Sequence, residues 1–353
     1  MAVGDVVVLG AGMISAVGLS SVETAASVRS AVMRFAEIPM LDHRFQPFTM
    51  AEVPEDGLPP VAEALAGPGI TMRERRMLRM ASAALRECVR ALPETAARPP
   101  LLLALPETRT ARPLDGAAFL AWLAVQAPGC FDPARSEAAF VGRAGGLVAV
   151  GQAVEHILAG QATVVMAGGV DTFRDPYVLG TLDMEARVKS AVHLDGMIPG
   201  EGAAFLLLAS RSFAASAGLA PLASVSVAAR GFEPGHLYSE EPYRGDGLAA
   251  TITQLIQSGS APAPIAEVYS SMNGESHWAK EWGVAFLRNR SWFVEGHGMH
   301  HPADCYGDVG AAAGPLMAGL AALGIRDGYR RAPALVYASS DRGERAALVV
   351  AAA

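Results

Sequence analysis

The distribution of hydrophobic residues predicts short buried strands that alternate with longer amphipathic helices. Residues 5–15, DVVVLGAGMIS, form a valine-rich strand with a glycine-rich end, and residues 21–33 have helical spacing behind a serine cap at Ser20 or Ser21. A second helix is predicted over 71–92, and the apolar run at 99–107 predicts another buried strand. The chain therefore begins as an α/β protein.

This alternation continues in two series of similar order. The small-residue segment RSFAASAGLAP separates them, so we expect halves at 1–210 and 220–353 that form one compact unit. Further elements are expected at 114–127, 138–142, 143–160, 162–171 and 200–210, then at 223–231, 247–257, 266–272, 274–287, 292–296 and 310–324, before a hairpin at 334–350. The shared order indicates a pseudo-repeat of two βαβαβαββ halves with largely parallel sheets.

Composition agrees with a large α/β protein and narrows its partners. The 353 residues are 51% hydrophobic and 18% charged, which suits a substantial core. The net charge is −7 and the only lysines are Lys189 and Lys280, so nucleic acid is not an expected partner. The cysteine pattern indicates no disulfide framework, metal site or cofactor, and no apolar run is long enough to span a membrane. We therefore expect a cytoplasmic protein.

The densest basic cluster lies in the predicted helix at 71–92. Arg73, Arg75, Arg76 and Arg79 alternate there with methionine and leucine residues. We interpret these arginines as the solvated face of an amphipathic helix.

Five motifs, in order, resemble β-ketoacyl-[acyl-carrier-protein] synthases of the thiolase-like superfamily. They are VVVLGAGMISAVGLSSVETAASVRS, GQAVEHILAGQATVVMAGGVD, DGMIPGEGAAFLLLAS, YSSMNGES and CYGDVGAAAGPLMAGLAAL. The resemblance covers nearly the whole chain and implies the layered αβαβα fold of that superfamily. A divergent branch without the Cys-His-His triad, some of whose members are encoded near type VI secretion genes, looks closer still through GRAGG, PGEGAAFLLL and HPADCYGDVGAA.

The residues on which condensation depends in that family are replaced in this chain. The family uses a cysteine at a helix N-terminus, where the thiolate is favoured, and two histidines. The resemblance places Arg143 at the cysteine position, Asn273 at the first histidine, and Gly307 or Asp308 at the second. A guanidinium cannot attack a thioester, so the resemblance implies a degenerate condensing site.

A buried arginine at a helix N-terminus opposes the helix dipole and needs a carboxylate partner. We consider Glu275, Asp304 and Asp171 as partners, with Asp171 and Glu275 lining the former active-site pocket; Asp171 could instead cap the next helix. Arg143 would then either bind an anion, such as a carboxylate or a phosphopantetheine phosphate, or form a structural ion pair that plugs the site. We favour the plug.

The segment HGMHHPADCYGD offers a displaced catalytic site. Cys305 could pair with His301 and Asp304 as a relocated thiolate–imidazole set for acyl transfer. Alternatively, the histidines are ordinary surface residues and Cys305 is an inert buried thiol.

We therefore predict a synthase-like protein that acts through binding, as an accessory or chain-length-factor-like subunit. Its dimer edge is predicted in the strand at 162–171, which implies a homodimer or a heterodimer with a related synthase. An acyl carrier protein or a secretion-cluster protein is a further expected partner. The alternative is an acyl-thioester enzyme that uses Cys305 and His301.

Overall fold

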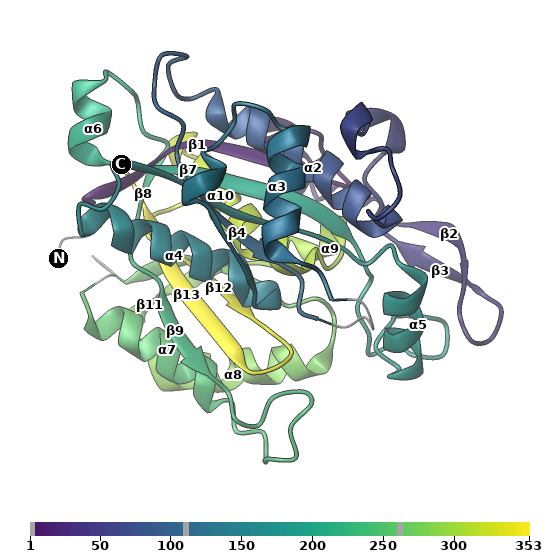
Figure 1. Ribbon diagram of the computed structural model, residues 1–353. Helices are drawn as coiled ribbons and strands as arrows, with labels where there is room; N and C mark the ends of the chain where they lie inside the picture. Colours follow the sequence, from purple (N-terminus) through teal and green to yellow (C-terminus); the bar gives the residue numbers. More distant parts are fainter. Residues whose placement is uncertain (1–3, 109–112, 260–263) are drawn as a thin grey trace.

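Eleven of the described strands form a mixed sheet that runs through both halves of the chain, and two more form a separate hairpin (Figure 1). The structure is a computed structural model and describes residues 4–108, 113–259 and 264–353. The first half contains β1 (Val6–Ser15), α1 (Ser21–Arg29), β2 (Ala36–Leu41), β3 (Pro47–Met50), α2 (Met72–Val89), β4 (Leu101–Leu105), α3 (Gly116–Gln126), β5 (Glu137–Phe140), α4 (Gly145–Leu158), β6 (Val164–Thr172), α5 (Pro176–Met184), β7 (Glu201–Ser210) and α6 (Arg211–Ser216). The second contains β8 (Ala223–Val225), β9 (Ala229–Phe232), α7 (Asp246–Gln257), β10 (Ile265–Ser270), α8 (Ser276–Asn289), β11 (Phe293–His300), α9 (Ala303–Tyr306), α10 (Ala313–Arg326), β12 (Ala334–Ser339) and β13 (Glu344–Ala351).

The two halves repeat one strand order. The first half runs β5-β4-β6-β7-β1, and the second runs β11-β10-β12-β13 followed by β8 and β9. In each half three neighbouring strands are parallel, while the last strand of the half returns antiparallel. β8 pairs with both β13 and β1 and so joins the two arrays. The sheets are therefore mixed, where we had expected them to be largely parallel.

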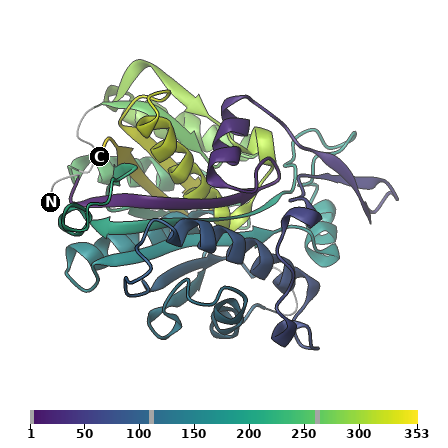
Figure 2. The same cartoon turned by 90° about the horizontal axis from the view of Figure 1, so that it is seen from above.

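Three hydrophobic clusters define the helical layers around the sheet. Helices α2 and α3 cover the outer face of the first half, and α7 and α8 cover the outer face of the second. Between the halves, α4 and α10 lie in a cluster that takes side chains from both arrays. Figure 2 shows α2 and α10 on opposite sides of β1. This is the predicted αβαβα layering.

Local sequence explains where the layers begin and how closely they approach. Helix α2 starts at a capping box, in which Thr71 accepts from the backbone of Glu74 and the Glu74 side chain accepts from Thr71. A Cβ at Gly12 of β1 would lie 1.9 Å from the Ala84 oxygen of α2, so only glycine allows this approach. Residues 313–324 of α10 are all buried, as expected for a central helix.

Two expectations about surfaces are wrong. The strand predicted as the dimer edge, β6, lies between β4 and β7, which occupy both of its hydrogen-bonding edges, and Val165 is fully buried. The exposed edge of this half is β5. The arginine face of α2 is not wholly solvated, because Arg73 and Arg76 are buried on carboxylates from β6 and β7.

The β2–β3 hairpin and helix α5 were not expected from the sequence pattern. They project at the end of the molecule opposite the termini (Figure 1) and share a small hydrophobic cluster. Within the described ranges, no helix is both long and apolar enough to cross a membrane.

Candidate functional site

Arg143 lies at the boundary between the two halves. It belongs to a 3-10 turn, Gly142–Ala144, that leads directly into α4. Gly142 has φ +70°, a left-handed conformation that turns the chain from β5 into this helix. The Arg143 side chain is 5% exposed, so its charge must be balanced inside the protein.

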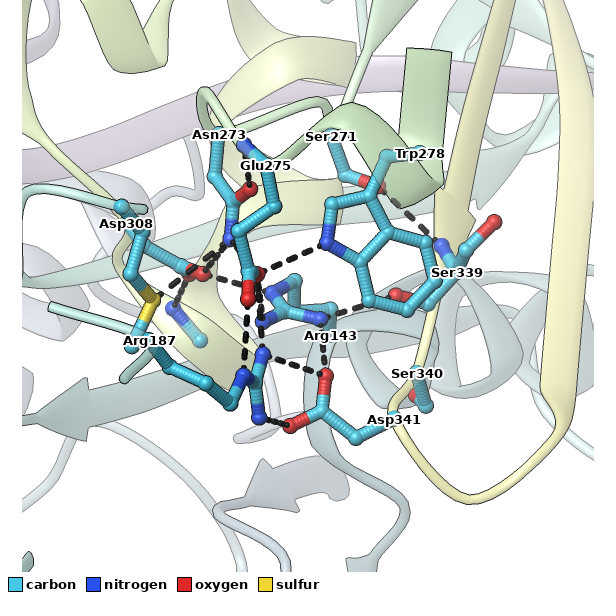
Figure 3. Close-up of polar contacts among 12 residues, drawn as sticks. Arg143, Arg187, Ser271, Asn273, Glu275, Trp278, Asp308, Ser339, Ser340 and Asp341 are labelled. Atoms are coloured by element: carbon cyan, nitrogen blue, oxygen red, sulfur yellow. Dashed lines mark hydrogen bonds and ion pairs between the residues drawn. The ribbon is translucent and has the colours of Figure 1, made fainter. Parts of the chain in front are cut away.

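Two carboxylates from the second half provide that balance. Arg143 Nε donates to Asp308 Oδ2 at 2.6 Å, and Nη1 donates to Asp341 Oδ1 at 2.6 Å and to the Ser339 carbonyl at 3.3 Å (Figure 3). The guanidinium also lies over the Trp278 ring, 5.0 Å from its centroid. Asp308 precedes α10 and Asp341 lies in the β12–β13 turn, so Arg143 connects both elements to α4.

A second buried arginine extends the network. Arg187, from the loop after α5, makes a bidentate pair with Glu275, with Nε and Nη2 at 2.7 and 2.8 Å from the two carboxylate oxygens. Its Nη1 donates to Asp341 Oδ2 at 2.7 Å and to the Tyr238 hydroxyl at 3.0 Å. Asp341 therefore bridges the two arginines, as Figure 3 shows.

The structure brings together three of the residues that the resemblance places at family catalytic positions. Asn273 Nδ2 donates to Asp308 Oδ2 at 2.8 Å and to Glu275 Oε2 at 3.0 Å, and Arg143 contacts the same Asp308 oxygen. Of the two candidates for the last position, Asp308 contributes its side chain, whereas Gly307 contributes a backbone turn at φ +71°.

Two of the expected partners of Arg143 lie elsewhere. Asp171 pairs with Arg73 at 3.2 Å and accepts from the Ala311 backbone, and burial raises its pKa despite Arg73. It does line the small cavity beside Arg143, but it does not cap the next helix, since the cap of α5 is Asp175. Asp304 is exposed and lines a different cavity. Glu275 is 4.0 Å from Arg143 and pairs mainly with Arg187.

The charges of the network keep Glu275 and Arg187 ionised although both are buried. Burial by itself raises the pKa of Glu275, but the hydrogen bonds and charge of Arg187, assisted by Arg143 and the Trp278 indole, lower it to about 2. Burial also opposes the charge of Arg187, and Glu275 outweighs it to raise the pKa of Arg187. The two groups hold each other ionised.

Little space remains beside this network. The cavity bordered by Arg143, Asp171 and Asp341 measures about 20 Å³, enough for about one water molecule. Pockets for drug-sized ligands span roughly 300–1,000 Å³. The arrangement can hold a fixed set of ion pairs, but it has no room for an acyl thioester.

Cys305, His301 and Asp304 line a separate cavity of about 210 Å³. Burial, and then the negative charge of Asp304, raise the pKa of the Cys305 thiol. Burial lowers the pKa of His301, and its Nδ1 is buried without a hydrogen-bond partner. Among the described residues no hydrogen bond joins Cys305 to a histidine, and no group of three or more His, Cys, Asp or Glu residues is placed to hold a metal ion.

Sequence reasoning missed Arg187, Asp341 and Trp278. Arg187 lies in a loop without periodicity, and its partners are 88 and 154 residues away along the chain. Trp278 follows Glu275 by one helical turn and donates its indole N–H to it at 2.9 Å, a spacing that could have suggested the contact. Asp341 stands in the SSDRGER turn, and no local pattern marks it as a partner of Arg143.

Comparisons with known proteins agree with this fold. A family model for the N-terminal domain of β-ketoacyl synthases matches residues 142–214. The structure is similar to the ishigamide ketosynthase/chain length factor, with a TM-score of 0.79 and 20% identity over 99% of both chains. It is also similar to a type II PKS ketosynthase solved with its acyl-carrier protein and bound to the hexaketide, with a TM-score of 0.79 and 17% identity over 99% of both chains.

The structure is also similar to a ketosynthase from a modular synthase. The ketosynthase from module 6 of the bacillaene synthase from Bacillus subtilis 168 matches with a TM-score of 0.79 and 13% identity, over 99% of this chain and 72% of that one. A search among curated protein sequences finds no match. The chain is thus a thiolase-like, ketosynthase-like protein in fold, and these matches carry no link to type VI secretion.

Proposed function

We propose that this ketosynthase-fold chain is a non-condensing subunit that acts by binding, in the manner of a chain length factor. The observation that carries the proposal is the buried network of Arg143, Asp308, Asp341, Arg187 and Glu275, which fills the position that the resemblance assigns to the condensing site. Each charged group in it has a partner from the other half of the chain. The site is therefore built as a structural centre.

The chemistry of the replaced residues supports this proposal. Claisen-type condensation needs a thiolate that accepts the acyl chain and groups that stabilise the developing carbanion. The Arg143 guanidinium is not a nucleophile, and the Asn273 side-chain amide already donates to the carboxylates of Glu275 and Asp308 and to the Met197 sulfur. Asp308 accepts hydrogen bonds from Arg143, Asn273 and the Gly310 backbone, so both of its carboxylate oxygens already have partners inside the protein.

The proposed partner surface is the free edge of β5. This strand pairs with β4 on one side, and its residues Glu137, Ala139 and Phe140 are exposed. An unpaired edge offers a row of backbone donors and acceptors to another strand. One similar solved protein is a ketosynthase/chain length factor and another is a ketosynthase with its acyl-carrier protein. We therefore propose a second copy or a related synthase as the partner at β5, and an acyl carrier protein as a further partner.

We place this assembly in a reducing compartment such as the cytoplasm. Cys88, Cys130 and Cys305 are all free and buried, which suits a protein that does not rely on disulfides. A secretion-cluster partner stays a prediction of the sequence resemblance.

The alternative proposal is acyl transfer through Cys305. It is favoured by the common cavity of Cys305, His301 and Asp304 and by the unpartnered His301 Nδ1. It is disfavoured by the raised pKa of the thiol, because a nucleophilic cysteine needs a lowered one. The first proposal therefore has the stronger physical support.

Intact-mass spectrometry distinguishes the two functions. The protein is incubated with acetyl- and malonyl-thioesters, on coenzyme A and on an acyl carrier protein, and both its mass and the condensed products are measured. We expect neither a covalent acyl group nor a condensed product. Stoichiometric acylation that is lost in Cys305→Ala but kept in the matched control Cys130→Ala would establish the alternative and overturn the first proposal.

A further inference from the structure

A cavity of about 210 Å³ lies between the end of α1, β10, β11 and the segment after α10, and its lining residues differ from those of the cavity beside Arg143. Its wall is partly apolar, through Val28, Met299 and Leu320. The rest of the wall is polar and includes two arginines, Arg29 and Arg330. The combination of apolar surface with a few convergent polar groups is typical of small-molecule sites.

Both arginines of this wall lie against the same aromatic ring, that of Tyr329. The guanidinium carbons of Arg29 and Arg330 lie 4.5 and 5.8 Å from the Tyr329 ring centroid. Within the described part of the chain, neither arginine makes an ion pair with a carboxylate. Arg330 Nε is in addition buried without a hydrogen-bond acceptor, as is His301 Nδ1 in the same wall. Buried polar atoms of this kind normally have partners, so a ligand or solvent must supply them.

Nearby acids do not neutralise these arginines. Glu267 is occupied by His300 at 2.7 Å and by Arg331 at 3.0 Å. Asp327 pairs with Arg326 at 2.6 Å, and the more distant charge of Arg29 adds to the lowering of the Asp327 pKa. Asp304, the acid in the lining, is exposed, and within the described residues it makes no ion pair with Arg29 or Arg330. The cavity thus keeps an excess of positive charge at its arginine side.

We propose that this cavity binds a small organic carboxylate, with its carboxylate group on Arg29 and Arg330 and its apolar part against Val28, Met299 and Leu320. A guanidinium presents a planar fork of donors that matches a carboxylate. The volume lies below the roughly 300–1,000 Å³ of drug-sized pockets, which limits the ligand to a short chain or a single ring. The proposal does not depend on the non-condensing function, since the two cavities share no lining residue.

Calorimetric titration of the whole chain with sodium butyrate tests the proposal, with inorganic phosphate as the second probe. We expect saturable butyrate binding that Arg330→Gln weakens by about tenfold or more, as for a lost charge-assisted hydrogen bond. Arg29 is exposed, so Arg29→Gln should keep the fold and also weaken binding. Arg326→Gln, a nearby arginine already paired with Asp327, is the matched control and should bind butyrate as the wild type does.

Thiol protection locates the ligand. Cys305 lines this cavity, whereas Cys88 is fully buried elsewhere and serves as an internal control. Saturating butyrate should slow alkylation of Cys305 by iodoacetamide about tenfold, read by peptide mass spectrometry. The proposal is overturned if butyrate does not bind, if folded Arg29→Gln binds it normally, or if Cys305 is not protected. Phosphate that binds as tightly as butyrate would overturn the organic carboxylate as the ligand class.

Discussion

Replacing Arg143 by methionine should destabilise the protein strongly, even though the new side chain has a similar length and is apolar. The variant removes the guanidinium that contacts Asp308, Asp341 and the Ser339 carbonyl. Asp341 keeps Arg187 as its partner, whereas Asp308, whose side chain is 2% exposed, loses its only cation in the described network. A buried carboxylate is then left with the neutral donors of Asn273 and Gly310.

The magnitude follows from that uncompensated charge. Removing one partner of a buried ion pair costs about 3–5 kcal/mol, more than the pair itself contributes. With roughly 2.1 cal/mol/K of unfolding entropy per residue, a chain of 353 residues that unfolds in one step should lose about 4–7 °C in melting temperature. Arg135→Met is the control: Arg135 is 55% exposed and pairs with Asp132, so it should cost less than about 1 kcal/mol.

Differential scanning calorimetry and urea unfolding measure both variants, and also Asp308→Asn, beside the wild type. The double variant Arg143→Met/Asp308→Asn should recover part of the loss, since it removes the stranded carboxylate. If Arg143→Met costs no more than Arg135→Met, or if the double variant loses the sum of both single changes, the network is not the buried charge centre described above.

Two other predictions concern acid stability and assembly. The pKa of Glu275 is lowered from 4.5 to about 2, so this group contributes up to about 3 kcal/mol to the free energy of unfolding. The contribution is fully present above about pH 4.5 and is lost as the pH falls toward 2. Glu275→Gln should flatten this part of the pH profile measured by urea unfolding, and a variant profile that matches the wild type in acid would contradict the prediction. Phe140→Glu on the β5 edge should weaken self-association about tenfold or more in sedimentation velocity, while Phe45→Glu, on the β2–β3 hairpin, should not; a wild-type chain that stays monomeric at every concentration would exclude the homodimer.

The sequence predicted most elements because their burial leaves a local trace. Continuous apolar runs such as that of β7 mark strands buried on both faces, and the capping box at Thr71 marks the start of α2. The β2–β3 hairpin has no such trace, because most of its residues are exposed and a proline interrupts β2. Helix α5 was missed for a related reason: it is short, and its buried residues form only a small cluster with the hairpin.

Residue positions in the site were more predictable than their partners. Motif order alone brought Arg143, Asn273 and Asp308 into consideration, and they lie together. Which carboxylate neutralises Arg143 depends on chain crossings that no local pattern records, since Asp341 is 198 residues away. The position of β6 inside the sheet is equally non-local, because a buried run does not reveal which strands flank it.

The shared oxygens of the Arg143 network also bear on how such a site can change. A single Arg143→Cys replacement would place a thiol beside Asp308 and Asp341, whose negative charges oppose formation of a thiolate, and would remove the cation that those acids need. Replacing Asp308 or Asp341 first would remove one of the two carboxylates that Arg143 contacts. A mutational route to a cysteine-containing site that begins at Arg143 therefore passes through a destabilised intermediate. A single Arg143→Cys change should yield a less stable protein rather than a working condensing enzyme.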